Sequence, residues 1–416
     1  MSAAAPANTP APTPAAATTA ASDGLGDHAR RWWADVRAGD LGSLPIFIGL
    51  IIIAIVFQSQ NDRFLTAGNF VNLIVQSAAF IAIGMGIVFV LLLGEIDLSV
   101  GYVSGVAGSL TALLLLPDGA DVPAIVAIAA ALVAGAAIGT LHGVLITKVG
   151  IPSFVVTLAG LIAWNGVVLL LIADRGTIVL QDDLVVGFSN DFLSDATAWI
   201  VALVAVAVYA GLLLNERRVR SAASLPTGPT SLTALRIVAF AVLLLAVVGI
   251  ANQDRGIPFV LVVLAVLFLG WTFVLNRTRF GRHVYAVGGS AEAARRAGID
   301  VDRVKIAVFA ICSMMAALGG IILASRLRSV DPGAGGGQIL LYSIAAAVIG
   351  GTSLFGGRGN VKSAVLGALV IASIDNGLGL LGLSSGTKFV VTGLVLLAAV
   401  TVDSVSRKGR AQSGRA

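Results

Sequence analysis

The chain has 416 residues, of which 57% are hydrophobic and only 12% are charged. Soluble domains carry roughly 25% charged residues, so this composition excludes an ordinary soluble protein. Apolar runs of about the 20 residues that cross a bilayer recur from Leu44 onward, without the polar face of an amphipathic helix. The sequence therefore predicts an all-α polytopic membrane protein, and the formal net charge of +5 must be explained within that class.

The two ends of the chain are predicted to be tails. Residues 1–43 are rich in Ala, Pro and Thr and then mildly charged, with no basic segment ahead of an apolar one. We therefore expect a disordered cytoplasmic N-terminal tail and no cleaved signal. The transmembrane domain is predicted to cover 44–403, and 404–416 to form a cytoplasmic C-terminal tail. The single cysteine, Cys312, excludes a disulfide framework.

Hydropathy predicts about twelve transmembrane helices. They cover 44–60, 70–93, 96–116, 122–147, 151–173, 197–214, 232–251, 257–275, 304–324, 338–354, 362–382 and 386–403. The third begins with a segment rich in Gly and Ser, which favours a broken or only partly spanning helix. Pro residues fall at the ends of the spans, where a helix tolerates them.

The distribution of Lys and Arg predicts the orientation. With the N-terminus inside, 21 of the 27 Lys and Arg residues lie on the cytoplasmic side. This asymmetry is the one that the positive-inside rule describes, so both termini are predicted to be cytoplasmic. The excess of basic residues is then explained by the membrane topology, and no nucleic-acid partner is needed to explain it.

Acidic residues follow the second predicted span. The stretch GEIDLSVG, residues 94–101, places Glu95 and Asp97 at its inner end. Acids favour helix N-termini, so the two carboxylates either cap the next helix or act in gating.

Four further polar residues lie within predicted spans. Asp375 and Asn376 belong to the stretch SIDNG in the eleventh span, and an ionisable group at that depth should face the bundle interior or water. We therefore favour a translocation-path or inter-helix role for this pair. Gln76 and Asn165 lie in the middle of their spans, where a buried amide most often bonds a neighbouring helix.

Motifs for enzyme chemistry are missing from the sequence. The nearest match to a phosphate-binding GxxxxGK[ST] loop, Gly356 to Ser363, has Val361 in place of the second glycine. Rossmann glycines, metal-ligand clusters and CxxC pairs do not occur. We expect no catalytic residue, no metal site and no directly bound cofactor, so any ATP and Mg²⁺ would belong to another subunit.

One hydrophilic segment, GRHVYAVGGSAEAARRAGIDVDR at 281–303, lies on the cytoplasmic side between the eighth and ninth spans. Ser290 can cap a short helix that has Glu292 in its first turn and Arg295 in its last, and Gly298 can end it. A helix of about two turns is marginal in water. The segment is therefore either a solvated loop or a helix that docks against a partner, which the small Ala293 and Ala294 would let approach closely.

Two glycine-rich stretches indicate an internal repeat of two halves. GEIDLSVG and GGTSLFGGRGN, residues 350–360, each follow a similar apolar run. Broken helices at corresponding places in two repeats are typical of a substrate path.

Together these motifs resemble the permease subunits of bacterial monosaccharide ABC importers. That family carries similar sequences in the same order as 94–101, 281–299 and 349–359. IPSFVVTLAG at 151–160, DRGIPFVLVV at 254–263 and an extra pair of spans are similar to its xylose branch. Many members have a glycine where this chain has Glu95, although xylose-type members also carry the acid.

The resemblance implies a location in the bacterial inner membrane and a set of partners. The expected assembly is a permease homodimer with two cytoplasmic ABC ATPase domains, supplied with a monosaccharide by a periplasmic sugar-binding protein. The loop 276–303 would couple the permease to the ATPase through Gly281, Arg282, Ser290, Glu292, Ala293, Ala294, Arg295 and Gly298. Gln76, Glu95, Asp97, Asn165, Asp375 and Asn376 are the expected residues of the translocation path or gate.

Two other classes of function remain as alternatives. An ion-coupled secondary sugar transporter fits the hydropathy equally well, and Asp375 is its only plausible coupling carboxylate. An intramembrane hydrolase would use Ser104 and His142, a poor signal for a catalytic triad.

Overall fold

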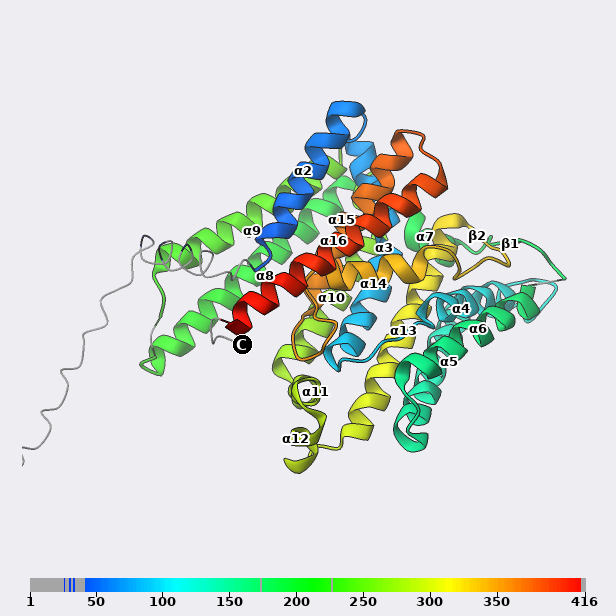
Figure 1. Cartoon of the computed structure of the whole chain (residues 1–416). Helices are drawn as coiled ribbons and strands as arrows, with labels where there is room; N and C mark the ends of the chain where they lie inside the picture. Colours follow the sequence, from blue (N-terminus) through cyan, green and yellow to red (C-terminus); the bar gives the residue numbers. More distant parts are fainter. Residues whose placement is uncertain are drawn as a thin grey trace, which may run out of the picture. The chain divides into compact units, whose positions relative to one another are not determined.

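The computed structural model describes residues 42–172, 174–225 and 227–412, together with Gly26, Arg30 and Trp33; side chains are described as far as Ala398 and at Thr401. Most of the expected N-terminal tail lies outside the described residues. Most of the described chain is helical (Figure 1).

Eight of the described helices are long and apolar enough to cross a membrane. They are α3 (Ala67–Leu92), α5 (Ala124–Val144) with the π-helical turn η1 (Leu145–Val149), α6 (Ser153–Ile172), α8 (Asp195–Ala222), α9 (Thr230–Ala251), α10 (Phe259–Arg277), α13 (Val301–Leu327) and α15 (Val361–Leu380). Shorter apolar helices are α2 (Leu44–Gln60), α4 (Val100–Leu114), α14 (Ile339–Ile349) and the first part of α16 (Ser385–Gln412).

Each of the twelve predicted segments overlaps one of these apolar helices, and the class of all-α polytopic membrane protein is confirmed, although only eight of the described helices are long enough to cross a membrane. The third predicted span is shorter as a helix than expected. Its helix, α4, begins only at Val100, and residues 95–99 have no helical structure. The last helix, α16, is longer than predicted, because it continues to Gln412, into the segment expected to be a tail.

Three short helices and one small strand pair complete the described fold. The helices are α7 (Asp183–Asn190), α11 (Arg279–Gly289) and α12 (Ala291–Arg296), and β1 (Ile178–Val179) pairs antiparallel with β2 (Ser329–Val330). Within the predicted connection 276–303, the sequence indicated only the short helix that Ser290 caps, and α11 is an additional helix. Its buried residues Gly281, Val284 and Val287 recur every three positions, which is the spacing of one helix face.

The chain divides into two compact units. Among the described residues, one contains those of 42–203 and 244–412, and the other contains those of 204–243. In the second unit, the ring centroids of Tyr209 and Phe240 lie 4.5 Å apart. Arg217 donates a hydrogen bond of 2.8 Å to the Thr230 hydroxyl, which ties the end of α8 to the start of α9.

Helices α3 and α13 form the centre of the larger unit, and α13 contacts α3, α4 and α5 (Figure 1). Glycines at every fourth position of α5 face α13. A Cβ atom on Gly139 would lie 2.1 Å from the Phe309 carbonyl oxygen, and one on Gly135 would lie 2.6 Å from the Ala317 Cβ. Small residues at this spacing let two membrane helices pack backbone to backbone. The middle of α13 therefore packs tightly against α5.

Contacts between the connecting segments agree with the predicted alternation of sides. Lys148 and Asp302, both predicted to be cytoplasmic, form an ion pair of 2.8 Å. Arg175 and Asp118, both predicted to lie on the other side, pair at 2.9 Å, and β1 and β2 also join two segments of that side. Segments expected on the same side of the membrane therefore lie together in the fold.

Candidate functional site

Three glycine-rich segments that are far apart in the sequence meet on the predicted cytoplasmic side. The Gly357 amide donates a hydrogen bond of 2.9 Å to the Leu92 carbonyl oxygen. A Cβ atom on Gly288 would lie 1.8 Å from that same oxygen, and one on Gly356 would lie 2.8 Å from the Gly288 carbonyl oxygen and 3.0 Å from the Gly94 nitrogen. We call Gly94, Gly288, Gly356 and Gly357 the glycine junction. Only residues without a side chain permit backbones to approach this closely.

Tyr285 fastens α11 to the same place. Its hydroxyl donates a hydrogen bond of 2.8 Å to the Gly359 carbonyl oxygen. Burial raises the pKa of this hydroxyl, so it keeps the proton that it donates. The junction and the tyrosine together fix the orientation of α11, and α12 begins only two residues after α11 ends.

Helix α12 has the caps that the sequence predicts. The Ser290 hydroxyl accepts a hydrogen bond of 3.2 Å from the Ala293 amide, and Gly298 follows the helix with a φ of +83°. Glu292 and Ala293 are exposed, whereas Ala294 is buried. The exposed face is therefore available to a partner, and Ala294 packs on the protein itself.

Two other residues predicted for the coupling loop lie outside α12. Gly281 is buried in the joint between α10 and α11, where a Cβ atom would lie 2.1 Å from the Leu275 carbonyl oxygen. Its role in the structure is to permit this joint. Arg282 is exposed on α11, and Arg295 is exposed at the end of α12.

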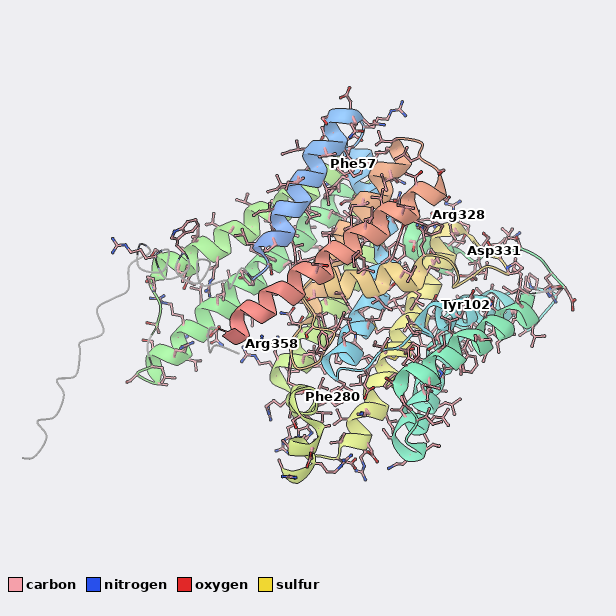
Figure 2. All side chains as sticks on the ribbon, viewed as in Figure 1. Phe57, Tyr102, Phe280, Arg328, Asp331 and Arg358 are labelled. Carbon is pink, nitrogen blue, oxygen red and sulfur yellow. The ribbon has the colours of Figure 1, made fainter. Side chains whose placement is uncertain are left out.

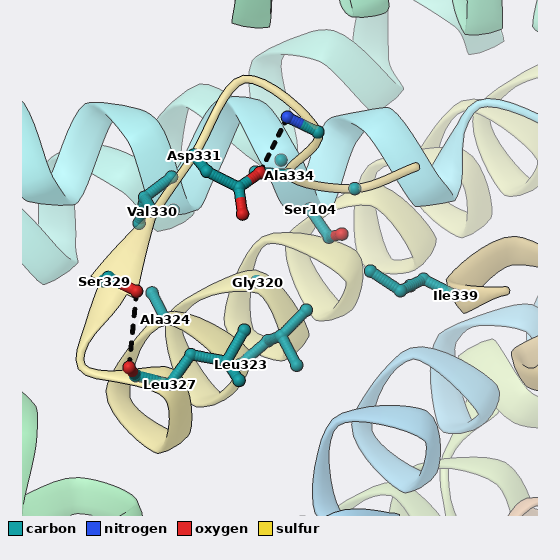
Figure 3. Close-up of a pocket in the computed structure, with 14 residues that line it drawn as sticks. Ser104, Gly320, Leu323, Ala324, Leu327, Ser329, Val330, Asp331, Ala334 and Ile339 are labelled. Carbon is teal, nitrogen blue, oxygen red and sulfur yellow. Dashed lines mark hydrogen bonds between the residues drawn. The ribbon is translucent and has the colours of Figure 1, made fainter. Parts of the chain in front are cut away.

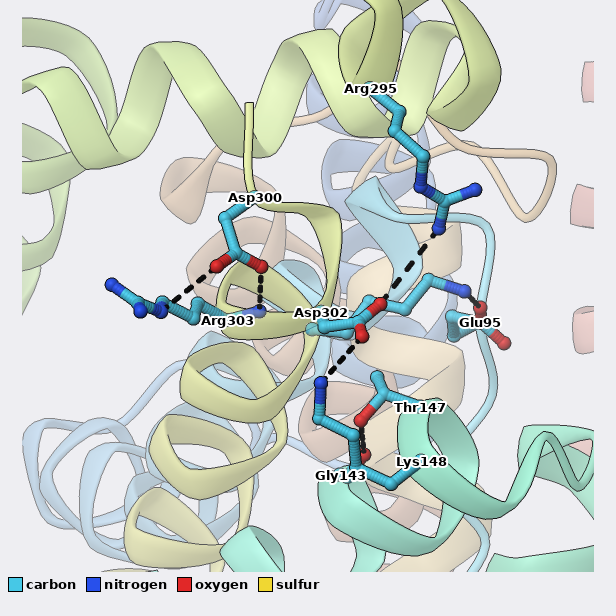
Figure 4. Close-up of polar contacts among 9 residues, drawn as sticks. Glu95, Gly143, Thr147, Lys148, Arg295, Asp300, Asp302 and Arg303 are labelled. Atoms are coloured by element: carbon cyan, nitrogen blue, oxygen red, sulfur yellow. Dashed lines mark hydrogen bonds and ion pairs between the residues drawn. The ribbon is translucent and has the colours of Figure 1, made fainter. Parts of the chain in front are cut away.

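Ion pairs connect α12 to the base of α13 (Figure 4). Asp302, in the first turn of α13, lies 3.8 Å from Arg295 and 2.8 Å from Lys148. One turn further, Lys305 forms an ion pair with Glu95. The structure thus gives Glu95 a specific cationic partner, which the sequence alone did not indicate.

Asp97 belongs to a buried chain of hydrogen bonds just before α4. One of its oxygens accepts from the Ser99 amide at 2.9 Å and from the Ser99 hydroxyl at 2.6 Å. The Ser99 hydroxyl lies 3.4 Å from His142 Nδ1, and Trp164 Nε1 donates to His142 Nε2 at 3.2 Å. Because Nε2 accepts from the indole, Nδ1 carries the proton and donates to Ser99. This chain joins α5 and α6 to the segment that leads into α4.

The same geometry gives no support to the hydrolase alternative. The Ser104 hydroxyl donates a hydrogen bond of 2.5 Å to the Gly101 carbonyl oxygen, so it is not oriented toward a base. His142 donates to the neighbouring Ser99 and accepts from Trp164, and therefore has no free nitrogen to remove a proton.

Amide side chains connect α3 and α15 on the opposite side of the molecule. Asn69 and Asn376 are buried and exchange two hydrogen bonds of 2.9 and 3.0 Å. Gln76 accepts a third bond from Asn376 at 3.4 Å. This is the inter-helix use of buried amides. Asn69 was missed in the sequence reasoning, although it lies two turns before Gln76 on the same helix.

Asp375 links three helices near this amide cluster. It accepts a hydrogen bond of 3.2 Å from the Tyr342 hydroxyl of α14 and lies 3.8 Å from the Lys388 ammonium group of α16. A cation and a hydroxyl beside the carboxylate explain how the bundle keeps an acid at this depth. Asn165 lies apart on α6, half-buried, and its side chain forms no hydrogen bond to any described residue.

A pocket of about 180 Å³ lies between α4, the end of α13 and the segment after β2 (Figure 3). Ser104, Gly320, Asp331 and Ala334 are among its lining residues. Asp331 and Arg328 lie along the connection that follows α13 (Figure 2). None of the six residues expected in the translocation path lines this pocket, which is therefore separate from both polar clusters.

Asp375→Leu is expected to lower solute uptake by roughly tenfold while the protein still inserts. Leucine suits the apolar surroundings, but it leaves the partly buried Lys388 ammonium group without its carboxylate partner and therefore poorly solvated. Uptake by membrane vesicles, normalised to the amount of inserted protein, measures the effect. Wild-type uptake by the mutant would reduce Asp375 to a tolerated buried acid.

The chain is similar to known proteins over most of its length. Residues 69–400 match the family described as branched-chain amino acid transport system / permease component. The chain is 36% identical over 370 residues to the xylose transport system permease protein XylH of Escherichia coli strain K12, covering 88% of this chain and 93% of that protein. The protein of the same name in Haemophilus influenzae is also 36% identical over 370 residues, which cover 88% of this chain and 98% of the relative.

A relative named for a different sugar is almost as similar. The ribose import permease protein RbsC of Escherichia coli strain K12 is 32% identical over 357 residues, or 86% of this chain and 92% of that protein. No solved structure matches the chain.

Proposed function

Because the chain belongs to the family of branched-chain amino acid transport permease components, we propose that it is the transmembrane subunit of an ATP-driven sugar importer. It passes a monosaccharide, xylose or a similar pentose, from a periplasmic binding protein into the cytoplasm across the bacterial inner membrane. The observation that carries this proposal is the glycine junction, which brings three motifs of the family together and orients α12 with an exposed face.

The proposed orientation places α12 in the cytoplasm. It rests on the bias of Lys and Arg toward that side, 21 of 27. The exposed face of α12 then docks on a cytoplasmic ABC ATPase, and ATP and Mg²⁺ bind to that subunit. A second permease copy and a periplasmic sugar-binding protein complete the assembly.

Xylose is favoured over ribose by a small margin of sequence similarity. The relatives named for xylose transport are 36% identical to this chain, and the one named for ribose import is 32% identical. The preference is also consistent with the two segments, 151–160 and 254–263, that are similar to the xylose branch.

The alternative function, an ion-coupled secondary sugar transporter, gains no support from the surroundings of Asp375. A coupling carboxylate must bind and release its ion from a water-filled site. Asp375, the only candidate, is already engaged by Tyr342 and Lys388. The relatives named above are components of transport systems or import permeases, in agreement with a multi-subunit importer.

The test is uptake of labelled xylose, ribose and glucose by cells that express this chain with its partner ATPase and binding protein. We expect xylose uptake that stops when ATP is depleted and continues when an ionophore collapses the ion gradients at constant ATP. Cells that lack the ATPase subunit serve as the control. Uptake that continues without the ATPase and stops with the ionophore would establish the ion-coupled alternative instead.

A further inference from the structure

The base of α13 is tied to three other segments by ion pairs on one side of its first turns. Asp302 and Lys305 are three residues apart, so their side chains lie on the same helix face. Asp302 pairs with Arg295 of α12 and with Lys148 of η1, and Lys305 pairs with Glu95 (Figure 4). Only residues 297–300 separate α12 from α13 along the chain, so a displacement of α12 reaches the base of α13 directly.

The Lys305–Glu95 pair differs from its neighbours in its burial. The side chains of Lys305 and Glu95 are 22% and 17% exposed, whereas those of Lys148 and Arg295 are 60% and 66% exposed. Exposed ion pairs are screened by water and contribute little. A partly buried pair resists separation more strongly, because each charge that loses its partner stays poorly solvated.

Glu95 belongs to a non-helical segment that is fastened at several points. The Thr157 hydroxyl of α6 donates a hydrogen bond of 3.2 Å to the Ile96 carbonyl oxygen, and Asp97 and Ser99 belong to the buried chain that ends on Trp164. Helix α4 starts directly after this segment, at Val100. The segment is therefore a short connection through which the base of α13 can move the start of α4.

We propose that the Lys305–Glu95 ion pair is a positioning contact that makes residues 94–99, and with them the start of α4, follow α12 when the ATPase moves it. The inference rests on the proposed function and adds one route of coupling within it. Neither residue touches the sugar or the ATPase in this proposal. The ion pair affects the number of sugar molecules transported per ATP hydrolysed.

The test compares Glu95→Gln, Lys305→Gln and the exchanged pair Glu95→Lys with Lys305→Glu, each purified with the ATPase and reconstituted into vesicles. We expect both single variants to retain the ATPase and to hydrolyse ATP, while sugar transported per ATP falls roughly tenfold. The exchanged pair should restore that ratio to within about threefold of wild type, since the attraction is restored.

The matched control is Arg303→Gln. Arg303 lies in the same turn of α13 and pairs with Asp300 at 2.9 Å, but its side chain is 87% exposed. It should leave the transport ratio unchanged. If the Lys305–Glu95 pair only stabilised the fold, the single variants would lose protein yield and ATP hydrolysis together. The exchanged pair would then show no change in the transport ratio apart from these two losses.

Three outcomes contradict the proposal: single variants with a wild-type ratio, an exchanged pair as impaired as the single variants, or an equal effect of Arg303→Gln. If a single variant fails to insert, Glu95→Asp, which keeps the charge, is expected to insert and to transport normally, and its failure would also count against the proposal. A wild-type complex that moves no sugar with ATP would instead contradict the proposed function, and the same vesicles report this.

Discussion

Ala293→Trp combined with Glu292→Lys is expected to leave the protein in the membrane but to abolish its retention of the ATPase subunit. Both residues lie on the exposed face of α12, so neither change disturbs internal packing. Tryptophan adds bulk where a partner groove must fit closely. Lysine removes the first-turn acid, which pairs with Arg296, and places a cation at the positive end of the helix.

The expected loss of ATPase affinity is at least roughly 30-fold, because interfaces lose most of their energy at a few central positions. Co-purification with the ATPase and sugar-stimulated ATP hydrolysis in reconstituted complexes measure it. Ala293→Ser, which keeps the side chain small, is the matched control and should behave as wild type. Undiminished association and coupling in the double variant would mean that α12 is only a connecting element.

Hydropathy predicted where the helices lie, because a chain that crosses a membrane does so in long apolar helical segments. Local rules also predicted α12, since the Ser290 cap and the Gly298 end depend only on residues within the helix itself. The late start of α4 agrees with the expected broken or partly spanning helix, although Gly101, Ser104 and Gly105 lie inside α4. Helix α11 was not predicted, although Gly281, Val284 and Val287 recur at the spacing of one helix face.

The partners of the polar residues could not be predicted from one sequence. Glu95 and Lys305 are 210 positions apart, and Asn69 and Asn376 are 307 positions apart. No local rule connects such residues, because their proximity depends on which helices pack together. The sequence therefore identified chemically unusual positions, while the structure shows that Glu95 is half of an ion pair and Asn376 half of a reciprocal amide contact.

The glycine junction could not be predicted from the sequence either. Its glycines were noted in the sequence as signs of broken helices and as parts of separate motifs. Their meeting point follows only from the packing of α3, α11 and the segment after α14, which the sequence did not define. A glycine that permits close approach cannot be distinguished from one that ends a helix until its neighbours are known.

Among alanine substitutions of the four glycines in the glycine junction, Gly288→Ala is expected to lower the stability of the protein most. The new Cβ atom would lie 1.8 Å from the Leu92 carbonyl oxygen and 3.0 Å from the Gly357 nitrogen, and both of these are backbone atoms. Backbone can give way only if the hydrogen bond between these two groups, now 2.9 Å, is broken. Overpacking costs about 1–3 kcal/mol where side chains can adjust, so we expect a loss of stability of about 3 kcal/mol or more.

Gly289→Ala provides the control at the next position. A Cβ atom there would have no other atom within 4 Å, and the residue has no positive φ, so the same methyl group meets neither contact nor strain. Thermal unfolding of the two purified variants in detergent compares them directly. Gly288→Ala should unfold at a clearly lower temperature and should also lose ATPase coupling, because α11 and hence α12 would be displaced. Equal stability of the two variants would show that the backbones at the junction separate at little cost, and that the orientation of α12 depends on the Tyr285 hydrogen bond and the ion pairs at the base of α13 instead.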